Sequence, residues 1–88
     1  MVRSTDATSG MSAYDKLIAS LVVVRRRANL SQRSLSRKVR QAPTFISKIE
    51  RGERQLGIVE LFDICATLEV DALPLLKEAF GGGKAVDR

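Results

Sequence analysis

The residues best suited to chemistry in this sequence lie within QRSLSRKVRQAPTFISKIE, residues 32–50. A helix predicted from Pro43 to about Arg51 would carry two unlike faces, at about 100° per residue. One face is apolar and can pack against a core: Ala42, Ile46 and Ile49. The other carries small hydroxyl and cationic side chains: Thr44, Ser47, Lys48 and Arg51. Such groups hydrogen-bond to base edges and phosphates, so this face is suited to contact with nucleic acid.

The remaining residue inventory does not favour catalysis. The chain has no histidine and one cysteine, Cys65, and we find no nucleophile–base arrangement and no cluster of metal ligands. We therefore expect no enzyme activity, no cofactor and no metal, and we expect Cys65 to be a core residue rather than a redox sensor. No apolar run approaches the roughly 20 residues of a membrane span, and no secretory signal is visible. A cytoplasmic protein without a membrane partner is expected.

The positive charge is concentrated around this stretch. Residues 13–56 contain 11 Lys or Arg and three Asp or Glu, a net charge of +8. Residues 57–88 contain three Lys or Arg and six Asp or Glu, a net charge of −3. This uneven distribution favours a polyanionic partner such as DNA for the first part of the chain.

The periodicity of the sequence predicts one small all-α domain, because no strand pattern appears in its 88 residues. We expect a disordered tail at 1–11, a folded domain at 12–80 and a flexible tail at 81–88. The helices are predicted at about 13–28, 32–39, 43–51, 58–68 and 72–80, with a turn at 40–42. The predicted N-caps are Ser12, Ser31, Gly57 and Asp71. Asn29 and Gly52 are expected to end the helices before them.

Apolar residues recur at helical spacing and define the expected core. The first helix carries the stripe Tyr14, Leu17, Ile18, Leu21, Val24 and Ala28. The second helix is anchored by Leu35 and Val39, and the fourth has the apolar side Ile58, Leu61, Phe62, Ile64, Cys65 and Leu68. Arg25 lies inside the first stripe. Since an unpaired buried charge is very costly, we expect Arg25 to have a buried acidic partner.

The segment LSQRSLSRKVRQAPTFISKIERGERQLGIVELFDICATLEVD resembles the Cro/phage-repressor-like helix-turn-helix family, also called the XRE family. The resemblance covers about Tyr14 to Leu76, and FISKIERGER followed by LEV is its most specific part. It implies a five-helix lambda-repressor-like bundle whose third helix, about Pro43–Arg51, enters the major groove. It further implies a homodimeric, sequence-specific regulator of transcription on double-stranded DNA, expected here to be a repressor.

The resemblance also assigns roles to particular residues. It implies base reading by Thr44 and Lys48, with Ser47 on the same face, while Pro43 matches a base-contacting position but has no donor. It implies phosphate contacts by residues at the start of the second helix and after the third: Gln32, Arg51, Arg54 and Gln55. It also implies a buried ion pair between Arg25 and Glu50, which agrees with the partner that the helical stripe requires for Arg25.

Two positions in the turn depart from the family pattern. Arg40 stands where the family usually has glycine, so Arg40 must adopt a positive φ at a steric cost, or the turn has another geometry. Ala42 stands where a Ser or Thr usually caps the third helix. Pro43 at the first helical position would compensate in part, because its ring presets φ.

Other interpretations of the chain stay open. Leu73, Leu76 and Phe80 either pack within the monomer or form a dimer interface, to which Val23 and Val59 could contribute. The chain could be an antitoxin with a toxin as its partner, or a restriction–modification controller, and in either case DNA binding would remain. It could also be a protein–protein adaptor without a specific DNA site, in which case it would lack affinity for DNA.

Overall fold

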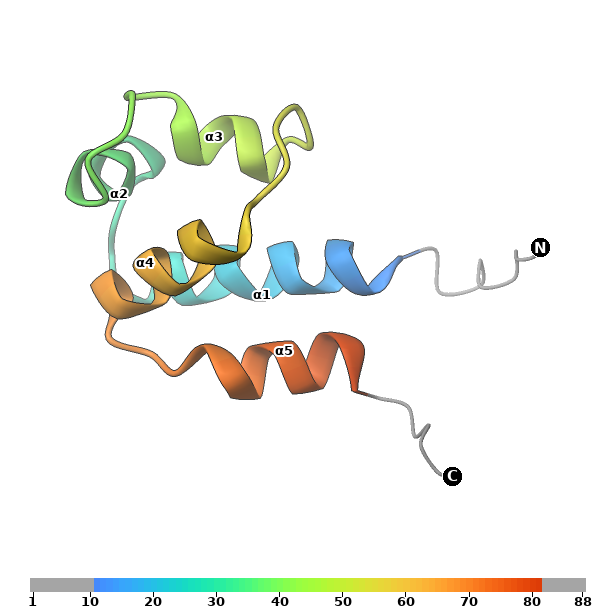
Figure 1. Cartoon of the computed structure of the whole chain (residues 1–88). Coiled ribbons are helices and arrows are strands. Elements are labelled where there is room, and N and C mark those ends of the chain that lie inside the picture. Colours follow the sequence, from blue (N-terminus) through green and yellow to red (C-terminus); the bar gives the residue numbers. More distant parts are fainter. Residues whose placement is uncertain (1–10, 82–88) are drawn as a thin grey trace.

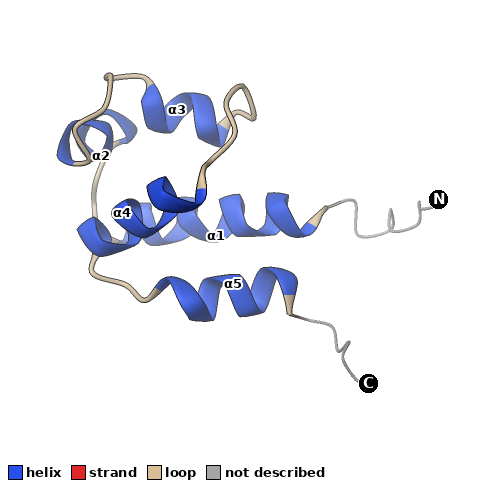
Figure 2. Cartoon of the chain, in the orientation of Figure 1, coloured by secondary structure: helices blue, strands red, loops and turns tan. Residues whose placement is uncertain are grey.

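A computed structural model describes residues 11–81 of the chain (Figure 1). In this range the chain forms five helices and no strand (Figure 2): α1 Ala13–Arg27, α2 Gln32–Lys38, α3 Phe45–Glu50, α4 Ile58–Leu68 and α5 Ala72–Phe80. The predicted all-α five-helix fold is therefore confirmed. The predicted tails, apart from Met11 and Gly81, lie outside the described residues.

The long helix α1 organises the bundle. Helix α5 packs along α1 in the opposite direction, while α2 and α3 form a neighbouring pair above them (Figure 1). Helix α4 contacts both α2 and α5 and so links the two pairs. The buried core draws on all five helices: Leu17, Ile18, Leu21, Leu35, Phe45, Ile46, Ile49, Leu61, Ile64, Cys65, Leu68, Ala72 and Ala79.

Four of the five helices begin where the sequence predicts because local hydrogen bonds cap them. The hydroxyl of Ser12 accepts from the Asp15 amide at 3.0 Å, and that of Ser31 accepts from the Ser34 amide at 3.0 Å. The Asp71 carboxylate accepts from the Leu73 amide at 3.1 Å. At α4 the Glu60 carboxylate accepts from the amide of Gly57 at 2.9 Å. These bonds satisfy amides that a helix start would otherwise leave unpaired.

The start of α3 differs from the prediction. The helix begins at Phe45 and ends at Glu50, two residues after and one residue before the predicted limits. The amide of Phe45 donates to the carbonyl of Ala42 at 2.9 Å, and Thr44 has φ −99° and ψ 7°. This is the geometry of a type I turn with Pro43 at its second position, which proline favours. Pro43 therefore belongs to the turn and not to the helix.

The predicted core is wrong at several positions. Ala28 and Ala42 are exposed, whereas Phe45, absent from the predicted apolar face, is buried. On α4, Ile58 and Phe62 are exposed although they were assigned to the packing side. The reason is that α4 meets its neighbours along a narrower stripe, made of Leu61, Ile64, Cys65 and Leu68. Burial also raises the pKa of the Cys65 thiol, as expected of a core residue.

Candidate nucleic-acid interface

Helices α2 and α3 are joined through Ser36, which is completely buried. Its hydroxyl donates to the carbonyl of Gln32 at 2.8 Å and accepts from the amide of Ile46 at 3.0 Å. Because one side chain bonds to both backbones, the angle between the two helices is held by hydrogen bonds as well as by packing. Sequence reasoning missed Ser36. Its place beside Leu35 and one turn after Gln32, on the buried side of α2, is the signal that could have found it.

The turn between α2 and α3 contains a left-handed residue that is not glycine. Arg40 has φ 62°, in the left-handed region, so the first of the two alternatives for this residue holds. The amide of Gln41 donates to the carbonyl of Ser36 at 2.9 Å, and that of Arg40 donates to the carbonyl of Arg37 at 2.9 Å. The backbone hydrogen bonds that end α2 therefore form, and their cost is the steric strain between the Cβ atom of Arg40 and its own backbone at positive φ.

A buried ion pair holds the C-terminal end of α3. Arg25 is 7% exposed, and its guanidinium donates to both oxygens of the Glu50 carboxylate, at 2.7 and 3.0 Å. It also donates to the carbonyl of Leu30 at 2.8 Å. The amide of Gln32 donates to the same Glu50 carboxylate at 2.7 Å. The network joins α1, α2 and α3, so the orientation of α3 depends on it.

This network determines where Gln32 lies. Its side chain is half-buried at the start of α2, and its amide nitrogen is directed at Glu50 rather than away from the molecule. The structure thus brings Gln32 together with the Arg25–Glu50 pair and not with the other residues that were assigned to phosphate contact. A phosphate contact by Gln32 remains a prediction.

The outer face of α3 presents the three residues assigned to base reading. Thr44 and Lys48 are exposed and Ser47 is half-buried. The side chain of Thr44 makes no capping bond, and Lys48 forms no ion pair among residues 11–81. The Ser47 hydroxyl donates to the Thr44 carbonyl at 3.0 Å, which leaves its oxygen lone pairs as acceptors. The opposite face, Phe45, Ile46 and Ile49, is buried.

The two arginines after α3 are each bound to a carboxylate. Arg51 donates to both oxygens of Glu53, at 2.9 and 3.0 Å, and Arg54 donates to both oxygens of Glu60, at 2.8 Å each. Hydrogen bonds from Arg51 lower the pKa of Glu53, and hydrogen bonds from Arg54 and from the Gly57 amide lower the pKa of Glu60. The Arg54 guanidinium also lies 4.8 Å from the centre of the Phe45 ring. A phosphate must therefore compete with a carboxylate for either arginine.

Gln55 is exposed beside these pairs, and its backbone carbonyl accepts a hydrogen bond from Arg54 at 3.0 Å.

Within the described range no three potential metal-ligating side chains gather at one place, and no helix has the length and apolar character needed to cross a membrane. The sequence prediction did not anticipate either arginine–carboxylate pair, although Glu53 follows Arg51 by two residues.

Comparisons with known proteins agree with this geometry. The helix-turn-helix family model matches residues 24–75. An XRE-family like protein from Pseudomonas syringae pv. tomato superposes with a TM-score of 0.73 and 29% identity, over 78% of this chain and 84% of that one. The clp gene regulator ClgR from C. glutamicum gives a TM-score of 0.69 and 27% identity, over 81% and 91% of the two chains. No curated protein matches the chain.

The family match spans the elements that build the site, from the end of α1 through the α2–α3 pair to α5. The Arg25–Glu50 network, the α2–α3 turn and the exposed polar face of α3 all lie inside it. The chain belongs to the XRE-type helix-turn-helix family of DNA-binding transcriptional regulators.

Proposed function

We propose that the chain is a sequence-specific repressor that acts in the cytoplasm and reads the major groove of double-stranded DNA with α3 as a homodimer. The main support is that α3 buries Phe45, Ile46 and Ile49, while its N-cap residue Thr44 and its own Lys48 are exposed. A helix held rigidly by its apolar side can place the polar side against base edges, and the major groove is wide enough to admit it.

Each residue assigned to base reading has a distinct task in this proposal. Lys48 donates to the O6 or N7 atom of a guanine, and Thr44 contacts a base edge or the methyl group of a thymine. Ser47 offers an acceptor, because its hydroxyl hydrogen is already directed at the Thr44 carbonyl. Gln32, Arg51, Arg54 and Gln55 are assigned to phosphates and fix the register of α3 on the duplex.

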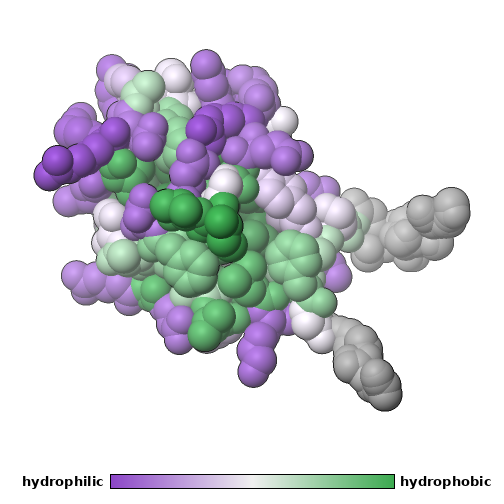
Figure 3. Space-filling view, viewed as in Figure 1, coloured by the Kyte–Doolittle hydropathy of each residue, from purple (hydrophilic) through white to green (hydrophobic). Residues whose placement is uncertain are grey.

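The proposed dimer would use the apolar residues that the monomer leaves exposed. Large hydrophobic side chains on α4 and α5 are exposed by 45–70%: Ile58, Val59, Phe62, Leu73 and Phe80. Figure 3 shows an apolar area over α4 and α5, below the hydrophilic surface of α2 and α3. Leu76 is half-buried and lines a groove of about 180 Å³ with Phe80. We propose that a second copy covers this area, since a monomer rarely exposes such a cluster without a partner.

Selection of bound sites from a pool of random duplexes tests the proposal. A homodimer with two α3 helices should enrich a palindromic site whose halves lie about one helical turn apart. Light scattering during gel filtration gives the mass of the free protein. Failure to enrich any sequence would contradict specific DNA binding. A palindrome bound by a chain that is monomeric at all concentrations would contradict the proposed interface.

The exposed apolar area also supports one alternative, an antitoxin or controller with a protein partner. A toxin could cover the same side chains of α4 and α5, and DNA binding by α3 would remain. Co-purification of one defined protein from the native host, together with a monomeric free chain, would favour this alternative over the homodimer.

A further inference from the structure

The part of the sequence that includes α2 carries positive charges and no negative ones. Between Asp15 and Glu50 the sequence contains nine Lys or Arg and no Asp or Glu. The ion pairs of the described residues join Arg25, Arg51 and Arg54 to carboxylates at position 50 or later. The three cations of α2, by contrast, are exposed and form no ion pair within residues 11–81: Arg33, Arg37 and Lys38.

These three cations lie on two different sides of α2. The side that faces α3 is marked by Ser36, which binds the backbone of Ile46. At about 100° per residue, Arg33 and Arg37 lie about 60° and 100° from Ser36, on the same side of it, whereas Lys38 lies about 160° away. Arg33 and Arg37 are also one helical turn apart, so their side chains are neighbours.

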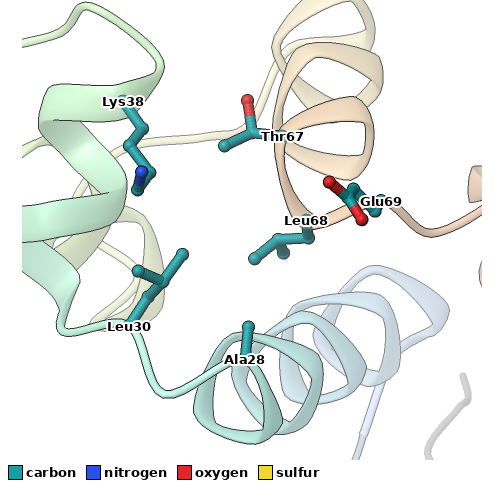
Figure 4. Close-up of a pocket in the computed structure, with 6 residues that line it drawn as sticks. All are labelled: Ala28, Leu30, Lys38, Thr67, Leu68 and Glu69. Carbon is teal, nitrogen blue, oxygen red and sulfur yellow. The ribbon is translucent and has the colours of Figure 1, made fainter.

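Lys38 lies at a different surface of the fold, near the end of α4. It lines an open hollow of about 500 Å³ with Thr67, Leu68 and Glu69, at the end of α4 (Figure 4). In this view Lys38 extends from α2 toward that hollow. The charge of α2 is therefore divided between the Arg33–Arg37 pair, beside α3, and Lys38, beside α4.

We propose that Arg33 and Arg37 together bind the phosphate backbone next to the groove that α3 enters. This inference rests on the proposed function of α3. A guanidinium matches a phosphate with two parallel hydrogen bonds, and two adjacent arginines repel each other until an anion lies between them. Arg51 and Arg54 must first leave their carboxylates, but Arg33 and Arg37 can bind phosphate directly. The family resemblance assigns no role to either residue.

Salt dependence of binding tests this pair, with Lys38 as the matched control. Each of the substitutions Arg33→Gln, Arg37→Gln and Lys38→Gln removes one charge from α2, and glutamine is nearly as good a helix former as the residues it replaces. Affinity is measured by fluorescence anisotropy over a range of KCl concentrations, with the selected duplex and with a scrambled one. Circular dichroism melts establish that each variant is folded.

We expect Arg33→Gln and Arg37→Gln each to lower the slope of log K against log[KCl] by about 0.9, the value for one lost phosphate contact. Applied from 1 M down to 0.15 M salt, this change in slope corresponds to about fivefold weaker binding at 0.15 M, the same for both duplexes. Arg33→Lys should keep most of the slope, and Lys38→Gln should leave it nearly unchanged.

Two results would overturn the inference in distinguishable ways. If the wild-type protein binds its selected duplex with a steep slope, but Arg33→Gln and Arg37→Gln behave like Lys38→Gln, the arginine pair is not a phosphate site and the proposed function stands. If the wild-type protein has no salt-dependent affinity for any duplex, both the pair and the proposed function fail.

Discussion

Loss of the Glu50 carboxylate should greatly destabilise this small domain. Arg25 is 7% exposed, and replacement of Glu50 by alanine would leave its guanidinium with the Leu30 carbonyl as its remaining partner and would remove the acceptor of the Gln32 amide. Breaking a buried pair by removing one partner costs about 3–5 kcal/mol. Since small domains are stable by about 5–15 kcal/mol, Glu50→Ala should lose a large part of its total stability.

Urea unfolding followed by circular dichroism measures this loss. Glu53→Ala is the matched control, because it removes the same chemical group from an exposed pair whose two side chains are each 53% exposed, and its midpoint should stay close to the wild-type value. The double variant Arg25→Met with Glu50→Leu should recover much of the stability, because neither charge is then left buried alone. A Glu50→Ala midpoint equal to that of Glu53→Ala would refute the structural role of the pair.

Four further outcomes follow from the described contacts and from the proposed function. Arg40→Gly should raise the free energy of unfolding by about 1 kcal/mol, because glycine adopts φ 62° without the side-chain strain; an unchanged urea midpoint would argue against that strain. Lys48→Ala should reduce discrimination between the selected and scrambled duplexes by about 1–3 kcal/mol, and equal discrimination in anisotropy titrations would remove Lys48 from base reading. The pairing with Arg54 lowers the pKa of Glu60, so the pair stabilises the fold at pH values above the ordinary pKa of 4.5, and this stability is lost as the pH falls through the lowered pKa. Glu60→Gln should therefore flatten the acid limb of a plot of unfolding free energy against pH, and an unaltered limb would count against the pair. Phe80→Asp should shift the proposed dimer to monomer in light scattering, and a dimer of undiminished strength would place the interface elsewhere.

Much of the fold could be predicted because its helix limits depend on neighbours in the sequence. Ser12, Ser31 and Asp71 each cap a helix through a residue two or three positions later, so a short window contains the whole interaction. Helix α4 was predicted at its observed limits for the same reason. The need of Arg25 for a buried acid also followed from its place in an apolar stripe, and the structure pairs it with Glu50.

The differences arise where tertiary contacts or turn geometry decide. Phe45 lies about 40° from Ile49 on the helical wheel, so helix periodicity allows its burial, but the predicted apolar face left it out and packing between α3 and the rest of the bundle decides it. The turn at Pro43 shortens α3 because proline fits the second position of a type I turn as well as it fits a helix start. The pairing of Arg54 with Glu60 depends on the path of the loop between them, which no local pattern specifies.

The central claim, that α3 reads bases in the major groove through Lys48, is tested most directly by replacing single guanines of the selected site with 7-deazaguanine. This base lacks the N7 acceptor of the major groove and leaves the minor groove unchanged. We predict that one position in each half-site weakens binding of the wild-type protein by about 1–3 kcal/mol and does not weaken binding of Lys48→Ala any further. Equal losses in both proteins at every position would contradict the claim, and no loss at any guanine would exclude the N7 atom as the acceptor of Lys48.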